Sequence, residues 1–97
     1  MTLTTLRTAA TDAVCLSRTL ADWCRTPDAV TPAEKNGLIE RLADCTEALP
    51  PTVADLPTMV QLRNRLRAVR VYLHVGERGA ARHEAKQLHR KLVRLPV

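Results

Sequence analysis

The chain has 97 residues, of which 45% are hydrophobic and 26% are charged, and only Trp23 and Tyr72 are aromatic. This length and composition predict one small helical domain, 1–97, with a core of leucine, valine and alanine. No apolar run is long enough to span a membrane, and the first residues do not have the pattern of a secretory signal. Three cysteines without regular spacing indicate reduced, mostly buried thiols, so we expect a cytoplasmic protein.

The charges are divided unevenly along the chain. Residues 58–97 contain ten lysines or arginines and two acidic residues, a net charge of +8. Residues 1–57 contain five basic and eight acidic residues, a net charge of −3. A basic half of this strength favours a partner that is itself anionic, either nucleic acid or an acidic protein surface.

Apolar residues at the helical period predict four helices, of which the first covers about 3–24. The second covers about 32–49 and has the clearest start. Thr31 is a typical N-cap, Pro32 suits the first helical position, and Glu34 completes a capping box. The apolar stripe of the first helix is Leu3, Leu6, Ala10, Ala13, Ser17, Leu20 and Cys24, and that of the second is Leu38, Ile39, Leu42, Cys45 and Leu49.

The third helix is predicted over about 58–75, after a proline-rich connection. Thr58 is the favoured first residue, and Asp55 is the alternative cap. The alternation of apolar and polar residues over 69–75 is also typical of a strand, but no other segment offers that strand a partner. Helix is therefore favoured, with an apolar stripe of Met59, Leu62, Leu66, Val69 and Leu73.

The fourth helix is predicted over about 80–95, after a turn that contains Gly76 and Gly79. The alternative is one long kinked helix that joins the third and fourth segments. The expected fold is an all-α, small four-helix bundle, in which the last apolar stripe is Ala81, Ala85, Leu88, Leu92 and Leu95.

The most regularly spaced basic residues lie on the third helix. Four basic residues recur at spacings of four, three and four, which places them on one face beside the leucine stripe. Arginine binds phosphate and carboxylate groups through a planar fork of donors, so this face is a candidate docking surface. We name it the arginine stripe, and it consists of Arg63, Arg67, Arg70 and His74. The candidate residues that follow it are more diffuse and are Arg78, Arg82, Lys86, Arg90 and Arg94.

These residues predict a non-enzymatic binding module whose basic helices contact the phosphate backbone of nucleic acid, alone or within a nucleoprotein assembly. A helix-turn-helix with 80–94 as its recognition helix is a narrower form of this hypothesis. The alternative is a small helical inhibitor or adaptor, of the size of phage accessory proteins, that binds a protein in a complex that handles nucleic acid. A solvated basic face without any partner is the third interpretation.

Catalytic and metal-binding motifs are absent from the sequence. His83 and Glu84 begin like the helix of a zinc protease, but the second histidine would be needed where Gln87 stands. The Gly-x-x-Gly sequence at 76–79 occurs in RNA-binding folds, but those folds need a sheet that this chain does not offer. We therefore expect no enzymatic activity, no metal or cofactor and no small-molecule substrate.

Two further surfaces bear on the choice of partner. Glu40, Asp44 and Glu47 share one face of the second helix and are a candidate internal counterpart of the arginine stripe. If they pair with it, less of its charge is available to another molecule. A weaker apolar strip on the third helix is a candidate homodimer surface and consists of Val60, Val71 and Val75.

Overall fold

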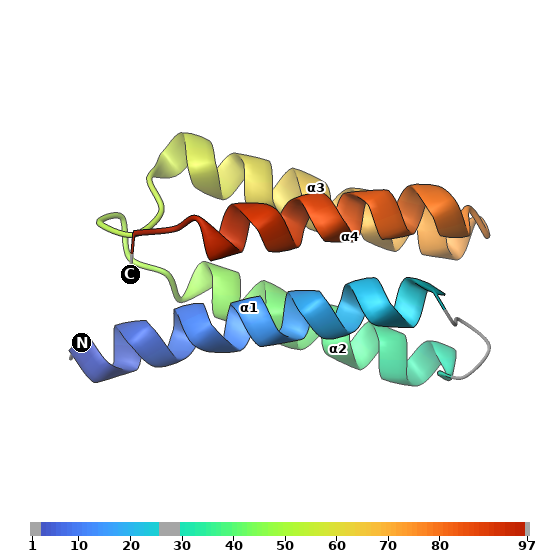
Figure 1. Ribbon diagram of the computed structural model, residues 1–97, viewed down its shortest axis with the longest axis horizontal. Coiled ribbons are helices and arrows are strands. Elements are labelled where there is room, and N and C mark those ends of the chain that lie inside the picture. The colour runs from blue at the N-terminus through green and yellow to red at the C-terminus, as the bar shows by residue number, and fades with distance from the viewer. Residues whose placement is uncertain (1–2, 26–29, 97) are drawn as a thin grey trace.

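In the computed structural model, the described residues are 3–25 and 30–96, with side chains described for 9–25 and 30–96. They form α1 (Leu3–Arg25), α2 (Pro32–Glu47), α3 (Leu56–His74) and α4 (Arg78–Val93). Successive helices run in opposite directions, so α1 begins and α4 ends at the same end of the bundle (Figure 1). The predicted four-helix bundle is confirmed, and each predicted helix end lies within two residues of the observed one.

The start of α2 follows the predicted capping pattern at Thr31 and Pro32, whereas no return hydrogen bond from the Glu34 side chain is found among the described residues. Thr31 has an extended backbone, with φ −70° and ψ 155°, and its Oγ1 accepts a hydrogen bond from the Glu34 N–H at 3.1 Å. Pro32 occupies the first turn, where no N–H is needed for a hydrogen bond within the helix. This cap gives a hydrogen-bond partner to one of the backbone N–H groups that the first turn of α2 leaves without one.

The third helix begins earlier than the favoured prediction. Asp55 is the N-cap, and its Oδ1 accepts a hydrogen bond from the Thr58 N–H at 3.0 Å. The Thr58 side chain and N–H also lower the pKa of Asp55. Pro57 fits in the first turn because the N–H that it lacks would have no partner within the helix. The prediction of Thr58 as the first residue is therefore wrong, and the alternative cap is the correct one.

A glycine separates α3 from α4. Gly76 has φ 80°, a left-handed conformation that side chains other than glycine rarely adopt. The Glu77 N–H donates to the Tyr72 carbonyl at 2.8 Å, and the Gly76 N–H donates to the Leu73 carbonyl at 3.3 Å. These two bonds form a Schellman motif, which ends a helix. The alternatives of one long kinked helix and of a strand over 69–75 are both wrong, and Gly79 lies inside α4.

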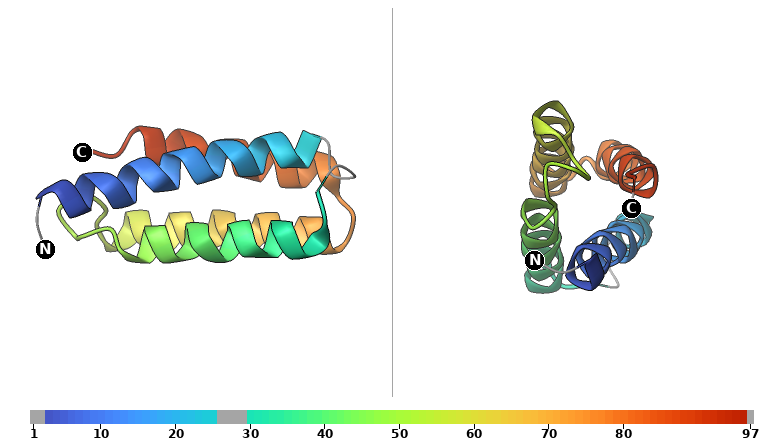
Figure 2. Two further views of the ribbon diagram at one scale, coloured as in Figure 1. Left: turned by 90° about the horizontal axis from the view of Figure 1, so that it is seen from below. Right: turned by 90° about the vertical axis from the view of Figure 1, so that its left-hand side faces the viewer.

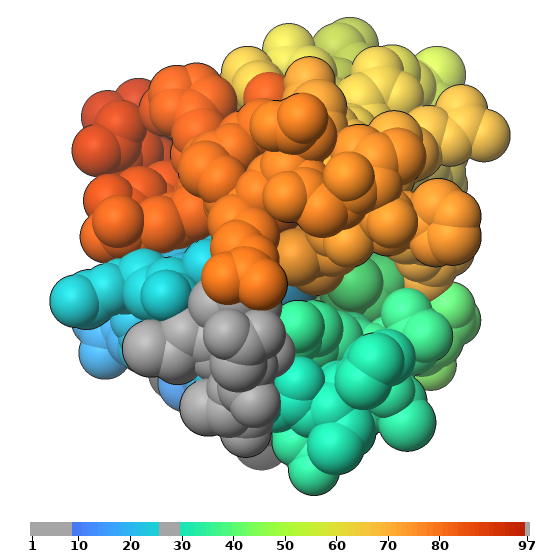
Figure 3. Space-filling model, turned by 90° about the vertical axis from the view of Figure 1, so that its right-hand side faces the viewer, coloured from blue at the N-terminus to red at the C-terminus, as the bar shows by residue number. Residues whose placement is uncertain are grey.

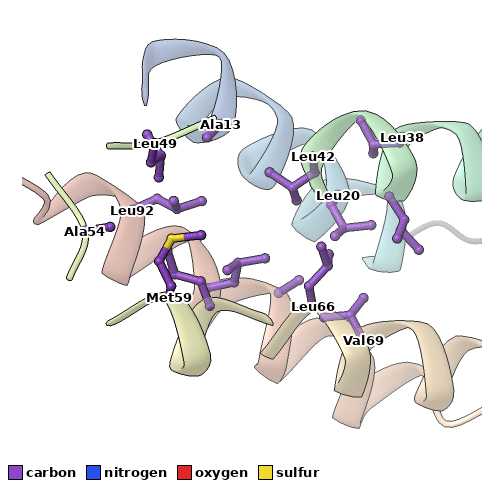
Figure 4. Close-up of a cluster of buried hydrophobic side chains, with 14 of the residues drawn as sticks. Ala13, Leu20, Leu38, Leu42, Leu49, Ala54, Met59, Leu66, Val69 and Leu92 are labelled. Carbon is purple, nitrogen blue, oxygen red and sulfur yellow. The ribbon is translucent and has the colours of Figure 1, made fainter. Parts of the chain in front are cut away.

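Side chains from all four helices meet in one core (Figure 4). The buried positions follow most of the predicted stripes, but the predicted Cys45, Leu73 and Leu95 are only half-buried, and on α2 Thr46 is buried instead of Cys45. The Thr46 hydroxyl donates to the Ala43 carbonyl at 2.8 Å, so its burial leaves no donor unsatisfied. Leu3 and Leu6 lie outside the described side chains. The largest fully buried side chains, in order of decreasing volume, are Leu20, Ile39, Leu42, Leu62, Leu88, Val69 and Ser17.

The four helices occupy the corners of a four-sided bundle (Figure 2). The closest packing joins α1 to α4 and α3 to α4, whereas among the four neighbouring pairs α2 and α3 are the least tightly packed. The last helix is thus the one most firmly held by its neighbours.

Replacing Gly37 with alanine is expected to stabilise the fold by about 0.5–1 kcal/mol. Gly37 is exposed in the middle of α2, and a Cβ atom placed there would meet nothing within 4 Å. Thermal unfolding followed by far-UV circular dichroism should show a midpoint about 4 °C higher. Gly76→Ala is the matched control and should lower the midpoint, since Gly76 has a positive φ. A lower midpoint for Gly37→Ala would contradict the placement of Gly37 inside a helix.

Candidate nucleic-acid interface

Two members of the arginine stripe are bound to the acidic face of α2. Arg63 donates from Nε and Nη2 to the two carboxylate oxygens of Glu47, at 2.6 and 2.8 Å. Arg70 donates from Nη2 to Oε1 of Glu40 at 2.5 Å. The hydrogen bond from Arg63 lowers the pKa of Glu47, so this carboxylate stays ionised at neutral pH. Glu40 and Glu47 are therefore internal counterparts of the stripe, as their spacing suggested, whereas Asp44 forms no ion pair among the described residues.

The two ion pairs lie on the side of the bundle where α2 and α3 are least tightly packed. A groove of about 310 Å³ runs between the helices there, lined by Glu47, Arg63 and Arg70. The side chains of Arg63 and Glu47 are about half exposed, so the pair adds little to stability. Its larger effect is electrostatic, because each paired carboxylate offsets a guanidinium charge that an outside anion would otherwise meet.

A third arginine of α3, which was not among the predicted site residues, is also paired. Arg65 lies on the opposite flank of α3, toward α4, and donates from Nη1 to Oε2 of Glu84 at 2.7 Å. Glu84 is the only acidic residue of α4. Three of the four arginines of α3 thus have carboxylate partners, and the only carboxylate on α4 faces α3.

The other members of the stripe, Arg67 and His74, are exposed and have no ion pair among the described residues. Arg67 lines the α2–α3 groove between the two ion pairs. His74 lines a hollow of about 180 Å³ together with Lys35 and Asn36 at the far end of α3. The stripe therefore does not act as one continuous cationic surface, and within the described chain Arg67 is its only arginine without a carboxylate.

Arg78 and Arg82 lie at the start of α4, at the end of the bundle shown in Figure 3. The adjoining ends of α3 and α4 and the connection between them fill the upper half of this view, above the ends of α1 and α2. Arg82 is half-buried, and its Nε has no hydrogen-bond partner among the described residues. Burial raises the pKa of the Cys24 thiol, and the positive charge of the nearby Arg82 opposes that rise. It thus faces α1 and not the outer surface of α4.

The remaining predicted residues lie together on the outside of α4. Lys86, Arg90 and Arg94 are exposed, and they project opposite the buried stripe that contains Ala85 and Leu88. Their spacing of four residues corresponds to about 6 Å along the helix, so the three charges extend over about 12 Å. His83 is exposed on the same face and was not among the predicted site residues. We call His83, Lys86, Arg90 and Arg94 the α4 outer face.

The α4 outer face has no ion pair with any described residue. Its three cations have a formal charge of +3, and no acidic residue of α4 lies among them. The i, i+3, i+7, i+11 spacing of its members could have identified His83 from the sequence, because it places them on one side of a helix. The pairing of Arg65 with Glu84 could not be found in this way, since it depends on how α3 and α4 pack.

Another histidine of α4 has an internal role. His89 Nδ1 is hydrogen-bonded to Ser17 Oγ at 2.8 Å, and the Ser17 hydroxyl also donates to the Val14 carbonyl at 2.8 Å. Ser17 is fully buried between α1 and α4. This contact orients α4 about its own axis, so that Lys86 and Arg90 point outward.

The three cysteines differ in burial and position. No group of three ligating side chains is found among the described residues. Cys24 is buried, Cys45 is half-buried and Cys15 is exposed, so the prediction of mostly buried cysteines holds in part. Cys24 lies near Lys35, whereas Cys45 lies near Asp12, so these two thiols are at different places along the bundle. Burial raises the pKa of both thiols.

The described helices include none that is long and apolar enough to cross a membrane.

The α4 outer face can bind anionic oxygen atoms, through guanidinium and ammonium donors on a rigid helix. It lacks aromatic side chains on which bases could stack.

Comparison of the chain with protein-family models, with curated protein sequences and with solved structures gave no match.

Proposed function

We propose that the protein is a non-enzymatic nucleic-acid-binding module that contacts the phosphate backbone of a duplex through the α4 outer face. The observation that carries the proposal is the unequal pairing of the two basic helices. Three of the four arginines of α3 are paired with carboxylates, whereas Lys86, Arg90 and Arg94 have none among the described residues. A surface of unpaired cations on a firmly packed helix suits a regularly spaced polyanion.

The proposed contact is with phosphates and not with bases. The helices α3 and α4 lie side by side and antiparallel (Figures 1 and 2), without the steep crossing of a helix-turn-helix. The narrower hypothesis of a recognition helix in the major groove is therefore not retained. Arginine and lysine contacts to phosphate carry no base information, so we expect similar affinities for duplexes of different sequence.

A titration of labelled duplex DNA and duplex RNA at several salt concentrations tests the proposal. Each phosphate neutralised by the protein adds about −0.9 to the slope of log affinity against log salt concentration for duplex DNA. Lys86, Arg90 and Arg94 together predict a slope of about −3. Absence of binding at low salt would contradict the proposal and would favour the role of an inhibitor or adaptor for an acidic protein.

A further inference from the structure

One face of α3 carries an apolar surface that nothing in the described chain covers. Four of the five large apolar side chains that are exposed among the described residues lie on this helix or at its C-cap. Leu56, Val60, Val71 and Val75 are 71%, 44%, 51% and 60% exposed. Their spacing places them on the side of α3 opposite the buried Leu62 and Leu66. We call these four residues the α3 apolar strip.

The α3 apolar strip is symmetric about its middle. Leu56 and Val75 are equally distant from the point between Arg65 and Leu66, and so are Val60 and Val71. Two copies of the helix that pack antiparallel about this point would therefore bring Leu56 against Val75 and Val60 against Val71, twice over. A twofold-symmetric interface requires this kind of self-complementarity.

The polar residues at the centre of the strip match in the same register. Asn64 and Arg67 are exposed and lie at equal distances from the same point, so each would face the other across the pair. An Arg67 guanidinium can donate to the side-chain oxygen of Asn64, and Arg67 has no carboxylate partner among the described residues. A parallel pair would instead place Arg67 against Arg67, which opposes like charges.

We infer that a second copy of this chain covers the α3 apolar strip in an antiparallel α3–α3 pair. The packing within each chain then determines where α2 and α4 of the two copies lie in the dimer. A twofold axis keeps equivalent flanks of the two α3 helices on the same side, and α4 lies on the flank that carries Gln61 and Arg65. Both α4 helices therefore lie on one side of the dimer and both α2 helices lie on the other. If the proposed function holds, one ligand can meet two α4 outer faces.

The contact is small, so the dimer is expected to be weak. A single helix of 19 residues is about 28 Å long, and one such pair buries less than a standard interface of about 1,600 Å². We expect a Kd on the order of 10–100 μM. Sedimentation velocity of the whole chain over a range of concentrations, without nucleic acid, measures it independently of the proposed function.

Charge substitutions test both the surface and the direction of the pair. Val60→Lys and Val71→Glu should each raise the dimer Kd at least about tenfold, because each places a charge against a valine. The double variant V60K/V71E should recover most of the affinity, since the introduced lysine of one copy would face the introduced glutamate of the other in the antiparallel register. An equimolar mixture of the single variants should also associate. All of these positions are exposed in the monomer, so circular dichroism should show an unchanged fold.

Val93→Lys is the matched control, because Val93 is 57% exposed on α4 and outside the strip. It should leave the dimer Kd unchanged. The inference is overturned if the wild-type chain stays monomeric at millimolar concentration, or if V93K dissociates the dimer as strongly as V60K. Failure of the double variant to associate better than the single ones would overturn the antiparallel arrangement, because a parallel pair opposes lysine with lysine. None of these outcomes depends on whether α4 binds phosphate.

Discussion

Replacing Lys86, Arg90 and Arg94 together with glutamine is expected to weaken duplex DNA binding at low salt by at least about 100-fold and to bring the salt slope near zero. Glutamine keeps the helix propensity of these positions while removing the charges. Each lost phosphate contact should reduce the magnitude of the slope by about one, whatever the DNA sequence. Fluorescence anisotropy with a short labelled duplex, at three or more salt concentrations, gives both quantities.

The matched control removes three cations from another surface. Arg18, Arg25 and Arg41 are exposed on α1 and α2. Their replacement by glutamine lowers the net charge from +5 to +2, as the α4 substitutions do. Binding that depends on net charge alone would fall equally in both variants. Equal losses would therefore contradict a defined α4 interface, whereas a loss confined to the α4 variant would support it.

Leu62→Ala is expected to lower the free energy of unfolding by about 2–5 kcal/mol, the largest effect on stability of any substitution considered. Leu62 is fully buried on α3, and its loss leaves a cavity in addition to the lost apolar transfer energy. A domain of this size has about 5–15 kcal/mol of stability in total, so the variant would lose a large share of it. Urea unfolding should show a lower midpoint with an unchanged slope.

Leu56→Ala provides the same substitution on the same helix at an exposed position. Leu56 is 71% exposed, so its replacement should change the unfolding free energy by less than about 0.5 kcal/mol when measured at low protein concentration. Similar losses for the two variants would mean that α3 is rotated from the orientation described above, with its apolar strip and not its leucine stripe inside the bundle.

The fold could be predicted largely from local patterns. Leu62 and Leu66 are spaced at the helical period, and Thr31 with Pro32 marks a helix start, because both signals depend only on neighbours in sequence. Local patterns do not determine the start of α3, because Asp55 and Thr58 both suit an N-cap. Pro57 did not decide between them, because proline is tolerated both before a helix and in its first turn.

The candidate site could be predicted only in part, because charge along the sequence does not show which residues pair. The spacing of Arg63, Arg67 and Arg70 indicated a common face, and the structure has that face turned toward Glu40 and Glu47. The cations with the more regular spacing, those of α3, are thus the ones that carboxylates of the same protein neutralise. Within the described chain, the charges of the α4 outer face, Lys86, Arg90 and Arg94, are left unpaired because no acidic helix packs against the outer side of α4.

The close packing of α1 against α4 also bears on how the chain acquires its structure during synthesis. The two helices are separated by most of the sequence, so their contacts form only after the last helix has left the ribosome. Until then, the side of α1 that carries Ser17, which His89 of α4 contacts, has no helix to cover it. The helix proposed to bind nucleic acid is therefore also the one that completes the core, and partly synthesised chains would have neither the basic surface nor a closed bundle.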